Sequence, residues 1–156
     1  MLAVVCPTGT GWIDGPASAS LEYLHDGDTA IAGFQYSADP SWIQLVLNLT
    51  IPDKAGRALF EAVYARWSRL PEDARPQLIP FGLSLGSYGS QAPFRSLEEV
   101  RARTNGAVWT GTPRFTPLHV SLVDDRDPGS TQVKPVYRGG EIVRWGTGNG
   151  GDQHLD

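Results

Sequence analysis

Short apolar segments alternate with helix-like segments through the first 110 residues, and few folds accommodate such an alternation. The expected strands cover residues 2–6, 29–36, 77–82 and 106–110. The expected helices cover residues 16–25, 39–48, 52–70 and 96–103. Strands that alternate with helices in this way form a mainly parallel sheet with helices packed on both faces. The sequence therefore predicts a three-layer α/β/α fold.

Two regions depart from this regular pattern. Pro80 falls inside the third expected strand, where a proline removes a hydrogen bond from the sheet, so we expect a bulge there. After residue 110 the pattern weakens, and residues 133–137 and 141–145 are expected as short strands around the turn at 138–140. Residues 146–156 contain four glycines and no periodicity, which predicts a disordered tail after a domain that covers residues 1–145.

Composition excludes several classes of protein. The net charge of −4 and the scattered basic residues argue against nucleic acid as a partner, because phosphate binding needs a basic surface. No apolar stretch approaches the ~20 residues that cross a membrane, and no basic segment that would indicate a secretory signal precedes the first strand. The one cysteine, Cys6, lies in an apolar run and is expected to be a buried, inert thiol. Nothing in the sequence implies a metal or a cofactor.

The segment with the clearest chemical meaning is Gly82-Leu83-Ser84-Leu85-Gly86, which fits the pattern G-x-S-x-G between an expected strand and an expected helix. In a nucleophile elbow the serine lies on a sharp, strained turn that exposes its Oγ. The flanking glycines leave room for the neighbouring strand and helix. We expect Ser84 to be a nucleophile and the Leu85 N–H to face a developing oxyanion. A glycine-rich turn with a solvated serine is the alternative.

A second glycine loop, residues 7–12, follows the first expected strand. In a hydrolase of this plan, the loop supplies the second oxyanion donor, here an N–H of Thr10 or Gly11. A glycine loop before a helix can instead bind phosphate, so a flavodoxin-like protein that holds a flavin with residues 8–12 is the alternative function. An ordinary strand-to-helix turn is the third interpretation.

Candidates for the catalytic base and acid are weak. In hydrolases with this elbow the chain order is serine, acid, histidine, and Asp127 followed by His154 satisfies it. His119 is another candidate base, in a loop that prolines flank. His25 precedes the elbow at the end of an expected helix, where a helix-dipole or solvated role fits better. No strand pattern places any of these residues beside Ser84.

Beyond these patterns, long stretches of the chain resemble a bacterial α/β-hydrolase family in which the hydrolase domain follows a membrane-spanning N-terminal region. The resemblance covers about residues 3–145 and is carried by the runs PTGTGWID, LEYLHDGDTAIAGFQYS, PSW, AGRALFEAVYARWSRLPEDARP, FGLSLGSYGS and DPGS. It implies an α/β-hydrolase fold, Ser84 as nucleophile, and residues 9–12 as the glycine loop. It also implies a small ester or similar acyl compound as substrate, with no cofactor.

The chain departs from the family at several points. An acidic residue is usual where Leu83 stands, and a strand-forming residue where Pro80 stands. The family's later aspartate and histidine motifs do not occur here, and neither does its membrane-spanning region. The resemblance therefore implies a central slice of a longer, membrane-associated protein, truncated at both ends. A catalytically inactive fragment that keeps the fold is the remaining alternative.

Overall fold

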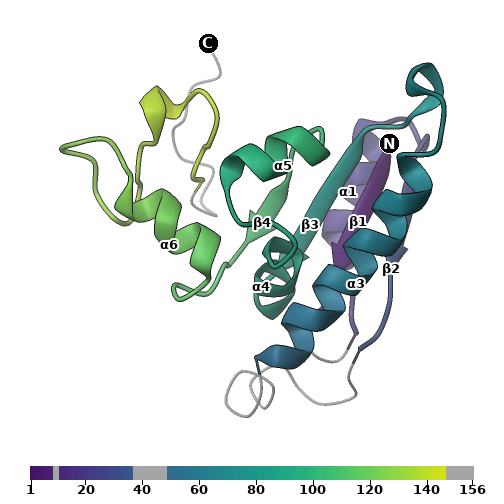
Figure 1. Ribbon diagram of the computed structural model, residues 1–156, viewed down its shortest axis with the longest axis horizontal. Helices are drawn as coiled ribbons and strands as arrows, with labels where there is room; N and C mark the ends of the chain where they lie inside the picture. Colours follow the sequence, from purple (N-terminus) through teal and green to yellow (C-terminus); the bar gives the residue numbers. More distant parts are fainter. Residues whose placement is uncertain (9–10, 37–48, 147–156) are drawn as a thin grey trace. The chain divides into compact units, whose positions relative to one another are not determined.

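The structure is a computed structural model that describes residues 1–8, 11–36 and 49–146 (Figure 1). The chain divides into two compact units, Met1–Thr116 and Pro117–Asp156, which we describe separately. The elements of the first unit are β1 (Leu2–Cys6), α1 (Gly15–Leu24), β2 (Ala30–Gly33), α3 (Thr50–Trp67), η1 (Glu72–Ala74), β3 (Leu78–Leu83), α4 (Leu85–Gln91), α5 (Leu97–Arg103) and β4 (Val108–Thr110). The second unit contains α6 (Pro117–Asp124) and η2 (Arg138–Gly140).

Among the described residues, four strands form one parallel sheet in the order β2-β1-β3-β4. Leu2 of β1 lies between Ala30 of β2 and Leu78 of β3, so the three strands begin in register. The last strand, β4, joins only at the carboxyl end of β3, where Val108 pairs with Phe81. This parallel order confirms the alternation predicted from sequence, and it brings the ends of β1, β3 and β4 to one edge.

Successive residues of β1 face opposite sides of the sheet, as strand geometry requires. Ala3 and Val5 join Met1 and Phe81 in a buried cluster, and Ala17 and Leu21 of α1 pack against it from one side. The intervening residue Val4 faces the opposite side. Figure 1 shows α3 in front of the strands and α1 behind them. The first unit is therefore built in three layers, with the apolar core on both faces of the sheet.

Side-chain caps determine where α1 and α5 begin. The Asp14 carboxylate caps α1 by accepting the Ala17 N–H at 3.2 Å, so the helix begins one residue earlier than predicted. A capping box is present at α5, where the Ser96 hydroxyl accepts the Glu99 N–H at 3.3 Å. The Glu99 carboxylate reaches back to the N–H of Arg95 at 2.6 Å. Both helix starts are therefore satisfied by hydrogen bonds between residues three or four positions apart.

Pro80 is accommodated without the bulge that we expected, because its pairing with Val4 continues an unbroken register. Odd-numbered β3 residues bond toward β1, since the Gln77 carbonyl accepts the Leu2 N–H. Even-numbered residues face the β4 side, where the Leu78 N–H donates to the Asn105 side chain. The N–H that Pro80 lacks would therefore point toward β4. However, β4 begins opposite Phe81, so it does not extend alongside Pro80. The missing donor leaves no carbonyl of β4 without a partner.

Other expectations need correction in extent. The second strand ends at Gly33, which pairs with Val5 of β1, rather than at residue 36, and the pairing does not continue to Cys6, the last residue of β1. The expected strands at 133–137 and 141–145 are reduced to one antiparallel bridge between Tyr137 and Val143. The expected helix at 39–48 and most of the expected tail lie outside the described residues. In the part of the chain that the structure describes, no helix has the length and apolar character to cross a membrane.

Candidate functional site

Ser84 lies in the turn that joins β3 to α4, at the carboxyl edge of the sheet. Its backbone angles are φ 56° and ψ −120°, a region that side-chain-bearing residues occupy only under constraint from their surroundings. The residue is exposed, although Leu85 and Gly86 after it are buried. A strained, exposed serine between a parallel strand and a helix has the geometry of a nucleophile elbow.

The two glycines of the motif are required for space. A Cβ on Gly82 would overlap the Gly86 carbonyl and lie 2.6 Å from the Ser87 nitrogen. A Cβ on Gly86 would overlap the Cys6 carbonyl oxygen and lie 2.9 Å from that of Pro7. These neighbours are backbone atoms that cannot rotate away. The glycines therefore allow α4 to start directly against the end of β1.

Backbone hydrogen bonds fix Ser84 on both sides. Its N–H donates to the Thr110 carbonyl at the end of β4 at 2.8 Å, and its own carbonyl accepts the Ser87 N–H at 2.9 Å. The Leu85 N–H belongs to the first turn of α4, where no preceding helical carbonyl is available to accept it. An N–H in this position can donate to an anion that forms beside Ser84.

A buried polar cluster lies one turn into α4, and the sequence reasoning did not identify it. The Ser87 hydroxyl is 2.6 Å from the Thr112 hydroxyl, and the Gln91 amide donates to both of them at 3.1 and 3.3 Å. Ser87 and Gln91 are 0% and 3% exposed. Their i, i+4 spacing on a helix that follows G-x-S-x-G is the signal that could have found them.

The second glycine loop closes on itself where the structure describes it. The Gly11 N–H donates to the Thr8 carbonyl at 2.9 Å, and the Thr8 N–H donates to the Trp12 carbonyl at 3.3 Å. The loop begins at Pro7, the residue that Gly86 approaches, so loop and elbow are neighbours. In this arrangement the Gly11 N–H is already used, which disfavours it as an oxyanion donor. Thr10, the other expected donor, lies outside the described residues.

The same loop is a poor phosphate site. Anions bind at helix starts because unpaired N–H groups and the helix dipole both attract negative charge. The start of α1 already holds the carboxylate of Asp14, bonded to the Ala17 N–H. A phosphate there would face a fixed negative charge, and the Gly11 N–H points into its own turn. Within the described residues of the loop, the flavodoxin-like alternative therefore has no electrostatic support, although its strand order would be the same.

Of the candidate acid and bases, His25 alone belongs to the same compact unit as Ser84. His25 caps the end of α1 at the opposite, amino edge of the sheet, where the neighbouring Asp28 carbonyl accepts the Met1 amino group. His119 is in α6 of the second unit, and His154 lies outside the described residues. Asp127 has a structural partner instead: its two carboxylate oxygens accept the N–H groups of Arg138 and Gly139 at 2.9 and 2.8 Å.

Two tyrosines near the loops are unsuited to act as bases. The Tyr36 hydroxyl donates to the Pro7 carbonyl at 3.3 Å, and burial, with a smaller contribution from Cys6, raises its pKa. Burial also raises the pKa of Tyr88, on the first turn of α4, and the Asp53 carboxylate adds to this. Both hydroxyls therefore remain protonated at neutral pH, so neither supplies a phenolate that could act as a base.

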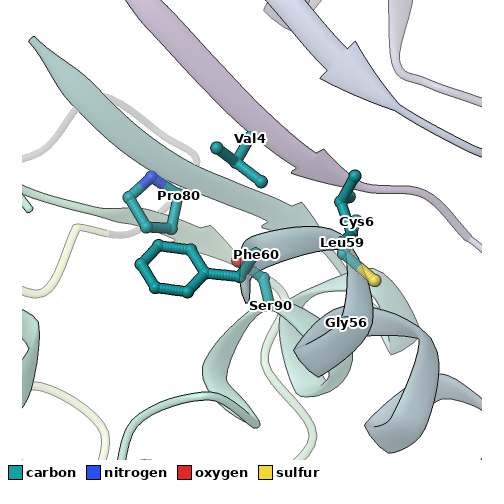
Figure 2. Close-up of a pocket in the computed structure, with 7 residues that line it drawn as sticks. All are labelled: Val4, Cys6, Gly56, Leu59, Phe60, Pro80 and Ser90. Atoms are coloured by element: carbon teal, nitrogen blue, oxygen red, sulfur yellow. The ribbon is translucent and has the colours of Figure 1, made fainter. Parts of the chain in front are cut away.

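Cys6 is the buried, inert thiol expected from its apolar surroundings. Burial raises its pKa to about 12, so the reactive thiolate is scarce at neutral pH. Its side chain lines a cavity between the sheet and α3 together with Val4, Phe60 and Ser90 (Figure 2). The cavity has a volume of only about 10 Å³, roughly enough for one water molecule, so it cannot hold a substrate.

The described residues contain no group of three His, Cys, Asp or Glu side chains arranged to hold a metal ion. A sequence search against curated proteins finds no match. A family model described as an alpha/beta-hydrolase family matches residues 1–154, which include both loops and the whole sheet. This match agrees with the parallel sheet, the three layers and the strained turn at Ser84. The chain belongs to the α/β-hydrolase family.

Proposed function

We propose that Ser84 is the nucleophile of a serine hydrolase that acts on a small ester or a similar acyl compound. One observation carries the proposal: an exposed serine has φ 56° in a strand-to-helix turn whose two glycines admit no side chain. Strain of this kind persists at functional sites because the surrounding structure enforces it. Membership of the α/β-hydrolase family supports the same assignment.

In the proposed reaction, Ser84 Oγ attacks the acyl carbon while a histidine takes the hydroxyl proton. The carbonyl oxygen becomes negatively charged and accepts the Leu85 N–H, and a second donor comes from the loop after β1. The tetrahedral intermediate expels the alcohol, which takes the proton from the histidine, and a water molecule then hydrolyses the acyl-enzyme.

The base must come from outside the first unit, because His25 is the one histidine between residues 1 and 116 and it lies at the opposite edge of the sheet. His119 and His154 are the other histidines of the chain. Without a paired base, a serine hydroxyl is a weak nucleophile at neutral pH. We therefore expect the 156-residue chain to be a slow esterase, limited to roughly 10³–10⁴ over water from oxyanion stabilisation and binding.

The family resemblance alone supports a wider proposal, that the active protein includes a further polypeptide segment with the acid and the base, anchored to a membrane. Expression of the chain together with any coding sequence that flanks it in the gene tests it. A Ser84-dependent rate far above that of the 156-residue chain is expected, with the protein recovered in the membrane fraction. Equal rates, or recovery away from membranes, would contradict it.

The test of the nucleophile is hydrolysis of p-nitrophenyl acetate and butyrate by the purified chain and by Ser84→Ala. A phosphonofluoridate probe, followed by mass spectrometry, locates the modified residue. We expect slow turnover that Ser84→Ala removes, with the phosphonyl group on Ser84. Equal rates for both proteins would refute the nucleophile, and fast turnover that His119→Gln or His154→Gln removes would show that the chain contains its own base.

A further inference from the structure

The strain at Ser84 needs a source of constraint beyond the two glycines. Glycines make room for the turn, but they do not hold it closed. A residue in a sparsely populated backbone region costs of order 1–3 kcal/mol, and it persists only where the surroundings over-determine it. The residues just beyond β4 are placed to supply that constraint, since the Thr110 carbonyl already accepts the Ser84 N–H at 2.8 Å.

Two residues further along, Thr112 meets the other side of the elbow. Its hydroxyl is 2.6 Å from the hydroxyl of Ser87 and 3.3 Å from the amide of Gln91. Both partners are buried and lie on α4, which shields their side of the cluster from water. Away from water, hydrogen bonds are stronger and an unpaired polar group is more costly. Gly111 separates the two threonines and has φ 59°, which turns the chain so that both can reach α4.

We propose that Thr112 is a positioning residue that holds α4 in the orientation which sets the Ser84 turn and aims the Leu85 N–H. This inference rests on the proposed function, because the consequence of the constraint is the reactivity of Ser84. The Thr110 carbonyl fixes the Ser84 nitrogen at the start of the turn, and the Thr112 hydroxyl fixes α4, the helix that follows the turn. Loss of the Thr112 hydroxyl lets α4 shift while the fold stays intact, because Thr112 lies in a half-buried loop.

The experiment uses the full chain with Thr112→Val, which removes the hydroxyl at nearly constant shape, and Thr112→Ser, which keeps it. Thr104→Val is the matched control: the Thr104 hydroxyl donates to the Val100 carbonyl at 2.7 Å at the end of α5, away from the elbow. The measurements are kcat and KM for p-nitrophenyl butyrate, and hydrogen exchange at the Ser84 and Ser87 amides. Gln91→Met, which removes the helix side of the cluster, serves if Thr112→Val does not fold.

We expect Thr112→Val to lower kcat about tenfold with KM within about twofold, and to raise Ser84 amide exchange by a similar factor. Thr112→Ser restores both, and Thr104→Val changes neither. Unchanged kcat and unchanged exchange in Thr112→Val overturn the inference. If the wild-type chain shows no Ser84-dependent turnover, the proposed function fails, and the exchange of the Ser84 amide alone decides whether Thr112 constrains the turn.

Discussion

Two glycine loops lie at the ends of adjacent strands, and they use glycine for different reasons. After β1, Gly11 itself has the positive φ of 81°, which lets the loop fold back on Thr8. After β3, Ser84 has the positive φ, and Gly82 and Gly86 are required because a Cβ at either position would overlap backbone atoms. The first loop closes on itself, whereas the second exposes the serine that lies between its glycines.

The largest expected difference between the loops is in their tolerance of a methyl group. We expect Gly86→Ala to lower the free energy of unfolding by about 3 kcal/mol or more, because the added carbon meets backbone oxygens of Cys6 and Pro7. Gly11→Ala should cost less, about 1–3 kcal/mol, because the positive φ strains an alanine and the carbons that it meets belong to the Gln35 side chain rather than to backbone carbonyls, although the Gln35 Cβ at 2.7 Å must also shift. Urea unfolding measures both, with Gly15→Ala as a control that has open space around it. Equal losses for the two variants would break the comparison.

The sequence predicted the loops but not what each one does. Strand–helix alternation placed both at one edge, because parallel strands share their direction. The G-x-S-x-G spacing predicted the Ser84 turn, since few other local patterns need glycine at both flanking positions. That the loop after β1 closes through its own N–H groups depends on its hydrogen-bond geometry, which spacing does not specify.

Polar residues were the hardest to interpret from sequence. Ser87 and Gln91 are of types usually found on the surface, and their burial follows from contacts with Thr112, about 21 to 25 residues along the chain. Asp127 fitted the chain order of a catalytic acid, yet its carboxylate is bonded to the turn at Arg138 and Gly139. Pro80 is tolerated because β4 begins opposite Phe81, the residue after Pro80. The local sequence pattern does not define where β4 begins.

A second prediction concerns Cys6, whose carbonyl lies under Gly86 and whose thiol is buried on the α3 side. Burial raises the pKa of the folded thiol from 9.0 to about 12. Between these values the unfolded state loses its proton and the folded state keeps it, so stability falls as pH rises. We expect Cys6 to contribute about 1.4 kcal/mol per pH unit above pH 9, so the stability of the wild type falls more steeply than that of Cys6→Ala by this amount.

The measurement is urea unfolding of both proteins at a series of alkaline pH values, and the quantity of interest is the difference between the two slopes. Subtraction removes the contributions of Tyr36, Tyr88 and other groups that titrate in the same range. Parallel pH profiles for wild type and Cys6→Ala would mean that the end of β1 is open to solvent, and that the Gly86 contact is looser than described.

A third prediction separates the loop after β1 from a phosphate site. Asp14→Ala removes the cap of α1 and should lower the free energy of unfolding by about 1 kcal/mol, while Asp14→Asn keeps the cap and should stay near wild type. Asp14→Asn also removes the negative charge at the helix start. Thermal unfolding with and without phosphate or flavin mononucleotide checks the difference, and we expect neither ligand to stabilise Asp14→Asn. Stabilisation would revive the flavodoxin-like alternative.

The smallest expected effect tests the strain at Ser84 itself. Ser84→Gly permits φ 56° without a Cβ, so part of the strain is released, and we expect the free energy of unfolding to rise by about 0.5–1 kcal/mol. Ser84→Ala keeps the Cβ and the strain, so it should match the wild-type stability while it also lacks the nucleophile. Differential scanning calorimetry resolves the difference as roughly 1–4 °C in Tm. If Ser84→Gly is no more stable than Ser84→Ala, the turn stores no strain, and the contrast between the two loops reduces to the space around Gly82 and Gly86.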